Sequence, residues 1–148
     1  MDRVVRVIVH RLSGSKKARD ACQLVECLYL AGRRVQVWLA DERKAAMFDE
    51  YLWTFADEAF VPHARWDGGG EVEEPVVVTS GPLRRWGQAQ VLVLLDPPEG
   101  VESLSLFEEV HDFVTTAPAD AGRAEAWRAA GFEVVEQRGV PATSPGRR

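Results

Sequence analysis

The sequence holds few of the residues that most often carry chemistry. Among 148 residues there are two cysteines, three histidines and two methionines. Cys22 and Cys27 lie five positions apart in a segment whose pattern predicts a helix, so they would face different sides of it. That spacing suits neither a short disulfide nor a metal site, and it predicts two reduced, mostly buried thiols.

Long hydrophobic runs are also missing. No stretch of roughly 18 or more apolar residues occurs, which argues against a helix that spans a bilayer. The first residues, MDRVVRVIVHR, are interrupted by charges and lack the features of a signal peptide. We therefore expect a cytoplasmic protein without a membrane partner. The length and the 46% hydrophobic content predict one globular domain, placed at residues 1–140, followed by a flexible tail at residues 141–148.

Positive charge is scarce except near the N-terminus. The formal net charge is −5, but residues 1–34 carry eight Lys and Arg residues against three acidic ones. Because binding to DNA depends on neutralising phosphates, an acidic protein with one basic region is not expected to bind DNA strongly. Such a region could still attract an acidic peptide, or be simply a solvated basic face.

Short apolar runs alternate with segments of helical spacing. Strands are expected over residues 4–9, 35–40, 75–80, 90–96 and 132–137. Helices are expected over residues 16–31, 41–53, 103–113 and 118–130, and residues 54–75 are expected to be irregular. Strands that are apolar throughout and alternate with helices predict a mostly parallel central sheet with helices on both faces. The expected class is α/β, a nucleotide-binding-like three-layer fold.

The residues that would make such a fold an enzyme are not found. The segment after the first strand, HRLSGSKKARD, contains one glycine and matches neither GxxxxGK[ST] nor GxGxxG, so the nucleotide site is missing. His10, His63 and His111 lack metal-binding spacing and are interpreted as surface or hydrogen-bonded residues. Ser80 lacks the GxSxG setting of a nucleophile. We expect no catalytic residue, metal or cofactor, although a small enzyme or nucleotide-binding domain stays open, since fold does not fix function.

Large aromatic residues stand where a core does not require them. Trp53, Phe60 and Trp66 fall in or beside the irregular segment, and Trp86 lies in a loop next to two arginines. Aromatic residues on loops with arginine nearby are typical of protein–protein hot spots. We expect Trp66 and Trp86 on the surface, whereas Phe60 could equally well close the edge of the sheet.

One segment, DEYLWTFADEAFVPH at residues 49–63, resembles the chi subunit of bacterial DNA polymerase III. In that family a helix ends in Asp-Glu-x-Leu-Trp, and a short loop leads to Phe-Val-Pro-His. The stretches FEEVHDFV (107–114) and WRAAGFEV (127–134) are similar to the family's third helix and its closing helix-Gly-Phe-strand unit. Length, strand order and the basic first helix agree along nearly the whole chain.

The resemblance implies a non-catalytic replisome adaptor in DNA replication. It would link the clamp-loader complex, through a psi-like partner, to single-stranded DNA-binding protein. The residues implied for the clamp-loader side are Trp53, Phe60, Val61, Pro62 and His63. The residues implied for the acidic, Phe-terminated tail of the single-strand binder are Arg123, Trp127 and Arg128 on the closing helix.

The closing helix departs from the family pattern. It has Ala121, Ala124 and Glu125 where bases or an aromatic residue would be expected. The tail contact is therefore in doubt, or uses another basic group. Two such groups are Lys16 with Lys17, and Arg84 with Arg85. A chi-like partner of a DNA-repair helicase is a third reading of the same resemblance.

Overall fold

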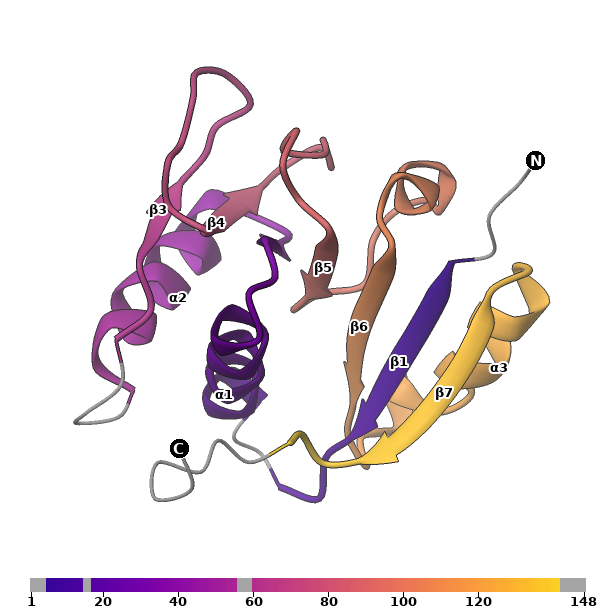
Figure 1. The fold of residues 1–148 in the computed structure, drawn as a ribbon. Coiled ribbons are helices and arrows are strands. Elements are labelled where there is room, and N and C mark those ends of the chain that lie inside the picture. Colours follow the sequence, from indigo (N-terminus) through magenta and orange to yellow (C-terminus); the bar gives the residue numbers. More distant parts are fainter. Residues whose placement is uncertain (1–4, 15–16, 56–59, 142–148) are drawn as a thin grey trace.

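The protein is built on one seven-stranded sheet in which every pair of neighbouring strands is parallel. The computed structural model describes residues 5–14, 17–55 and 60–141. The strand order is β3-β4-β2-β5-β6-β1-β7 (Figure 1). The strands are β1 (Arg6–Arg11), β2 (Val35–Leu39), β3 (His63–Arg65), β4 (Val76–Ser80), β5 (Val91–Leu94), β6 (Glu109–Val114) and β7 (Glu133–Arg138).

Among the described residues, three α-helices and two short 3-10 turns cover the sheet. They are α1 (Lys17–Leu30), α2 (Glu42–Thr54), η1 (Glu102–Leu106), η2 (Pro118–Asp120) and α3 (Arg123–Ala129). Together with the parallel sheet they confirm the predicted α/β class. No helix among the described residues has the length and apolar character needed to cross a membrane. The predicted tail, apart from its first residue, and Lys16 lie outside the described residues.

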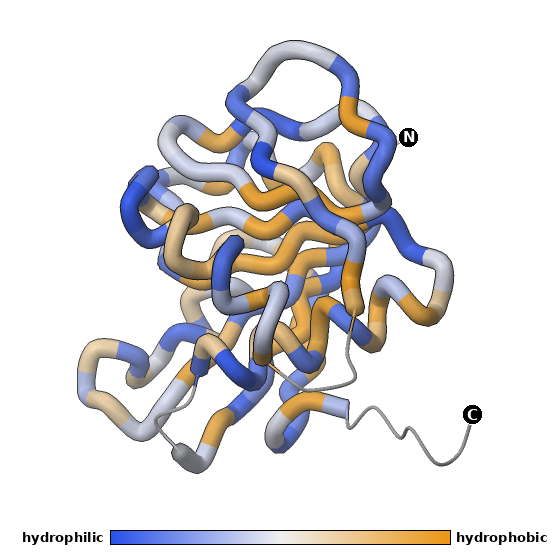
Figure 2. The backbone as a smooth tube through the Cα atoms, turned by 90° about the vertical axis from the view of Figure 1, so that its left-hand side faces the viewer, coloured by the Kyte–Doolittle hydropathy of each residue, from blue (hydrophilic) through white to orange (hydrophobic). Residues whose placement is uncertain are grey.

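The two faces of the sheet carry separate hydrophobic cores because successive side chains of a strand point to opposite sides. Val35 and Val37 of β2 belong to the core beneath α1 and α2. Trp38 of the same strand belongs to the second core, with Trp127 of α3 and Leu104 of η1. Both sides of β2 are therefore buried, which explains its continuous run of apolar residues. In Figure 2 the hydrophobic stretches of the tube lie mainly in the middle of the molecule, and hydrophilic stretches gather in the outer loops.

The first two helices form where the sequence predicts them. The Asp41 carboxylate caps α2 by accepting a hydrogen bond of 2.8 Å from the Lys44 backbone N–H, one of the donors that a helix start leaves unsatisfied. One stripe of α2 is buried through Ala45, Phe48 and Leu52. α1 ends just before Gly32, whose φ of 82° is a left-handed conformation that glycine adopts without strain.

The helix predicted over residues 103–113 is wrong. The chain makes only the turn η1 there and then enters β6, which lies between β5 and β1. Val110 faces one core and Phe113 the other, which is the alternation of a strand. The apolar residues matched helical spacing by coincidence, and burial on both faces in the middle of the sheet decides the conformation.

The helix predicted over residues 118–130 is only partly right. It is interrupted at Gly122, which has a φ of 78°, so that η2 ends before it and α3 begins after it. The prediction that residues 54–75 are irregular is wrong at β3, a three-residue edge strand paired with β4. A strand this short gives too few residues for an alternating pattern to be recognised.

Two neighbouring strands in the middle of the sheet send the chain in opposite directions. From the carboxyl end of β2 the chain runs through α2 toward β3, whereas from β5 it runs through η1 toward β6. Such a place is a topological switch point, and open α/β sheets usually bind their ligands outside the carboxyl ends of the strands there.

Candidate docking surfaces

Two aromatic side chains stand together on the surface where α2 ends and β3 is about to begin. Trp53 is 44% exposed and Phe60 is 63% exposed. Their ring centroids are 5.7 Å apart, with an angle of 38° between the ring planes. Neither ring closes the edge of the core, and each leaves apolar area that a partner could cover. We call Trp53 and Phe60 the aromatic patch.

The other three residues implied for the clamp-loader side support the aromatic patch from below. Val61 is buried in the core under α2, and Pro62 is half-buried. His63 is buried, and its ring centroid lies 4.0 Å from that of Trp53. The His63 ring nitrogens lie 2.7 Å from the Val61 carbonyl oxygen and 3.0 Å from that of Asp49, and Nε2 also lies 3.3 Å from the Asp49 carboxylate. Two of the five residues are thus presented, and three hold them in place.

The closing helix α3 is arranged differently, because two of its three implied contact residues bind a buried carboxylate. Asp112 of β6 is only 2% exposed. Arg123 donates to it from Nε at 3.0 Å and from Nη2 at 3.3 Å, and Trp127 donates from Nε1 at 2.8 Å. Trp127 itself is 6% exposed. A buried charge needs such partners, so Arg123 and Trp127 serve the interior of the protein.

Arg128 is the exposed residue of the three, and two carboxylates already accompany it. Its Nη1 lies 2.8 Å from Glu125 and its Nη2 lies 2.9 Å from Glu136. The hydrogen bond from the Arg128 guanidinium holds the pKa of Glu136 below its usual range. An acidic peptide at this place would compete with both glutamates for one arginine.

The expected surface position of Trp86 is wrong, and that of Trp66 is only partly right. Trp86 is 3% exposed and belongs to the second core, against which the half-buried Trp66 also packs. The loop before β5 folds over the sheet face that α1 and α2 do not cover. Trp86 packs against that face, as a side chain of a covering helix would. Buried Gln36 fixes the loop, accepting from the Trp86 backbone N–H at 2.7 Å and donating to the Arg84 carbonyl oxygen at 2.7 Å. The sequence feature that could have indicated the buried position of Trp86 is Gln36, a glutamine inside an otherwise apolar strand.

The histidines were expected to be surface or hydrogen-bonded residues. All three are buried and hydrogen-bonded, so the surface alternative is wrong. His10 Nε2 lies 2.8 Å from His111 Nδ1, and His111 Nε2 lies 2.6 Å from a Glu109 oxygen. Burial, together with the neighbouring His111, lowers the pKa of His10 to about 4. The second nitrogen of His10 meets the Gly139 carbonyl oxygen at 2.9 Å, so the chain of contacts spans β1, β6 and the end of β7.

Cys22 of α1 is buried in the core beneath α1 and α2. Burial raises the pKa of the Cys22 thiol to about 12, which keeps it protonated and unreactive. Within the part of the chain that the structure describes, no three His, Cys, Asp or Glu side chains are grouped so that they could hold a metal ion.

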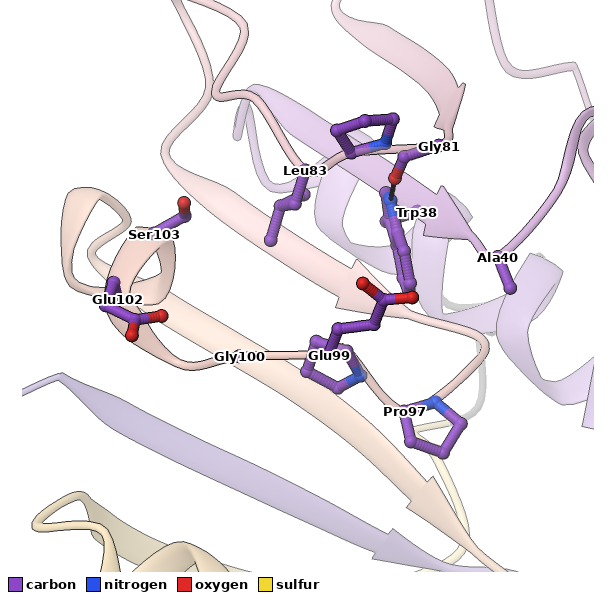
Figure 3. A pocket seen from close by; sticks show the side chains of 11 residues that line it. Trp38, Ala40, Gly81, Leu83, Pro97, Glu99, Gly100, Glu102 and Ser103 are labelled. Carbon is purple, nitrogen blue, oxygen red and sulfur yellow. Dashed lines mark hydrogen bonds between the residues drawn. The ribbon is translucent and has the colours of Figure 1, made fainter.

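Two hollows lie at the switch point, one on each face of the sheet. The first has a volume of about 460 Å³ and surrounds Trp38, whose Nε1 donates to the Gly81 carbonyl oxygen at 2.8 Å (Figure 3). Prolines and the carboxylates of Glu99 and Glu102 complete its wall. The second has a volume of about 510 Å³ and lies between α1 and α2, beside Leu39. It is lined mainly by apolar side chains, and two lysines stand at it.

The fold is shared with a protein of unrelated sequence. The structure titled Mss116p DEAD-box helicase domain 2 bound to an RNA duplex is similar with a TM-score of 0.58 and 9% identity. The match covers 91% of this chain and 64% of that one. At this identity the likeness shows the α/β fold alone.

Sequence comparison identifies the family. The DNA polymerase III subunit chi of Pseudomonas aeruginosa is 29% identical over 120 residues, which are 80% of this chain and 81% of the relative. That of Escherichia coli is 29% identical over 117 residues, or 76% and 79%. Residues 4–141 match the family described as DNA polymerase III chi subunit, HolC. The match confirms the resemblance seen in the sequence and the expectation of a non-catalytic accessory subunit. The chain belongs to the DNA polymerase III chi subunit family.

Proposed function

We propose that this chi-family protein is a cytoplasmic adaptor of the replisome, and that the aromatic patch docks the clamp-loader side through a psi-like partner. The observation that carries the proposal is the exposure of Trp53 and Phe60 on a buried support. Two large rings in contact with solvent contribute little to the fold. They are held at a fixed mutual position, as residues of a binding hot spot are.

The support limits the conformational entropy that a partner would have to overcome. Trp53 leaves from the last turn of α2, and its ring rests on buried His63. Phe60 directly precedes Val61, which is anchored in the core. A preorganised pair of aromatic rings loses less freedom on binding than the same rings on a mobile loop, so more of the interaction energy appears as affinity.

The test replaces each patch residue singly in the full-length chain. Trp53→Ala and Phe60→Ala should each weaken binding to the psi-like subunit, or to the clamp loader of the same organism, by about thirtyfold, or ~2 kcal/mol. Leu106→Ala is the matched control, because Leu106 is also a large exposed apolar residue but lies on η1. Calorimetric titration gives the affinities. Unchanged affinity in folded patch variants would contradict the proposal.

The second proposed partner is the acidic tail of single-stranded DNA-binding protein, bound weakly and in a salt-sensitive manner at the closing helix. Of the three implied residues, Arg128 is the one a peptide can reach, while Arg123 and Trp127 position the helix through Asp112. Since exposed ion pairs are screened within about 8 Å at physiological ionic strength, affinity should fall as salt rises. Anisotropy titration of the labelled tail with Arg128→Glu tests this, and binding that the substitution leaves unchanged would remove Arg128 from the site.

A further inference from the structure

The groove between α1 and α2 lies apart from the aromatic patch and from the closing helix. Its sides are formed by Ala18 of α1 and by Phe48 and Tyr51 of α2. Leu39 at the end of β2 and Leu95 directly after β5 also line it. These are the two strands that meet at the topological switch point, where α/β sheets usually bind ligands. Its volume of about 510 Å³ is large enough for one or two apolar side chains.

The charge at this groove is positive and not fully compensated. Lys44 is paired, because its ammonium lies 3.2 Å from the Asp96 carboxylate. Lys17 is half-buried at the start of α1, and no carboxylate of the described residues lies within 4.0 Å of its ammonium. Burial lowers the pKa of Lys17, an effect that Asp112 and Asp96 oppose from a greater distance. A carboxylate brought next to Lys17 would therefore stabilise a charge that the protein leaves without a close partner.

The rim of the groove points to a macromolecular occupant. Met47 is 64% exposed, one of the large apolar side chains that the fold leaves uncovered, and it stands on the α2 side of the groove. A small molecule within the groove would leave this side chain in water, whereas a peptide crossing the rim would cover it. Flexible methionine is common on surfaces that accept peptide side chains.

We propose that the α1–α2 groove is a docking site for an acidic peptide segment of a partner protein. An apolar side chain of the segment enters the groove between Leu39 and Phe48, and a neighbouring carboxylate pairs with Lys17. The segment then crosses Met47. This site rests on the proposed adaptor role, to which it adds a surface at the switch point.

The experiment measures anisotropy of a fluorescein-labelled octapeptide with the full-length chain. The peptide carries Leu-Phe between two pairs of aspartates and is amidated at its carboxyl end, and a second peptide has Ser-Ser in place of Leu-Phe. Lys17→Glu and Met47→Glu alter the groove. Arg43→Glu is the matched control, since Arg43 is exposed on α2, undergoes the same charge change and does not line the groove. Thermal melts establish that each variant is folded.

Lys17→Glu and Met47→Glu should each weaken binding about tenfold, and Arg43→Glu less than about twofold. The Ser-Ser peptide should bind at least about tenfold more weakly than the Leu-Phe peptide. Equal effects of Lys17→Glu and Arg43→Glu would overturn the site, because only general charge attraction would remain. Displacement of the peptide by 4-phenylbutyrate would also overturn the proposal if it occurs at the concentration at which the peptide half-saturates the protein. The groove would then be a site for small acids. Trp53→Ala and Phe60→Ala should leave peptide binding intact. The groove is therefore tested independently of the proposal that the aromatic patch binds the clamp-loader side.

Discussion

The aromatic patch and the closing helix each place a tryptophan near the end of a helix, yet the fold uses the two in opposite ways. Trp53 is almost half exposed, and its ring packs at a tilt against a buried histidine. Trp127 is buried, and its Nε1 donates to Asp112. The patch therefore turns outward from a rigid support, whereas the closing helix turns inward to satisfy a buried charge.

This difference shows what decides whether an aromatic residue and an arginine form a binding surface. On the closing helix, an aspartate inside β6 takes up the donors of both Trp127 and Arg123. On the patch, the nearby polar group is His63, whose ring nitrogens face backbone carbonyl oxygens and the partly exposed Asp49 carboxylate, 3.3 Å from Nε2. These contacts go to His63, so the Trp53 ring remains available. A buried carboxylate close in space is the feature that separates the two cases.

The largest expected effect concerns the buried ion pair. Arg123→Ala should lower the free energy of unfolding by about 3–5 kcal/mol, because it leaves Asp112 buried with an uncompensated charge. Arg128→Ala on the same helix should change it by no more than the error of measurement, since that arginine is exposed. Urea denaturation of both variants compares them directly. Equal stability of the two variants would contradict the inward-facing role of Arg123 on the closing helix.

Acid should destabilise the half of the sheet that carries the closing strand. The pKa of His10 is about 4 in the folded protein and about 6.5 in an unfolded chain, so between these values the unfolded chain binds the extra proton. The free energy of unfolding should therefore fall by roughly 3 kcal/mol as pH decreases from 6.5 to 4, and it should not depend on His10 above that range. His10→Gln should flatten the curve. The same slope in wild type and variant would argue against this assignment.

A smaller effect separates the two tryptophans themselves. Trp127→Phe keeps most of the packing but removes the donor to Asp112, and it should cost about 2 kcal/mol of stability. Trp53→Phe removes no hydrogen bond of the described structure and should cost less than about 0.5 kcal/mol. Guanidinium denaturation monitored by far-UV circular dichroism is suitable, since it does not depend on the tryptophan that is removed. A larger loss of stability for Trp53→Phe than for Trp127→Phe would contradict the comparison of the two tryptophans.

The sequence predicted the sheet well where local pattern and burial agree. The runs containing β1, β2, β4 and β5 are apolar and rich in β-branched residues. β6 was misread because the apolar residues around it repeat at helical spacing. Its conformation depends on lying between β5 and β1, which is a property of the tertiary structure.

The docking role of the signature residues stays a prediction, and the sequence could not indicate which of them would be exposed. The signature identified Trp53, Phe60 and His63 together, but it could not tell which would face solvent, because that depends on Asp49 and on the path of β3. Nor could the sequence indicate that Trp127 is buried and donates to Asp112. Asp112 lies in a segment read as a helix, and only the strand conformation brings its carboxylate to α3.

The central claim is that the aromatic patch, and not the closing helix, faces the clamp-loader side. Hydrogen–deuterium exchange of the full-length chain, alone and saturated with its psi-like partner or clamp loader, tests it most directly. The claim predicts slower exchange in the last turns of α2 and in β3, with α3 and β7 unchanged. Protection confined to α3 and β7, with α2 and β3 exchanging as in the free protein, would contradict it.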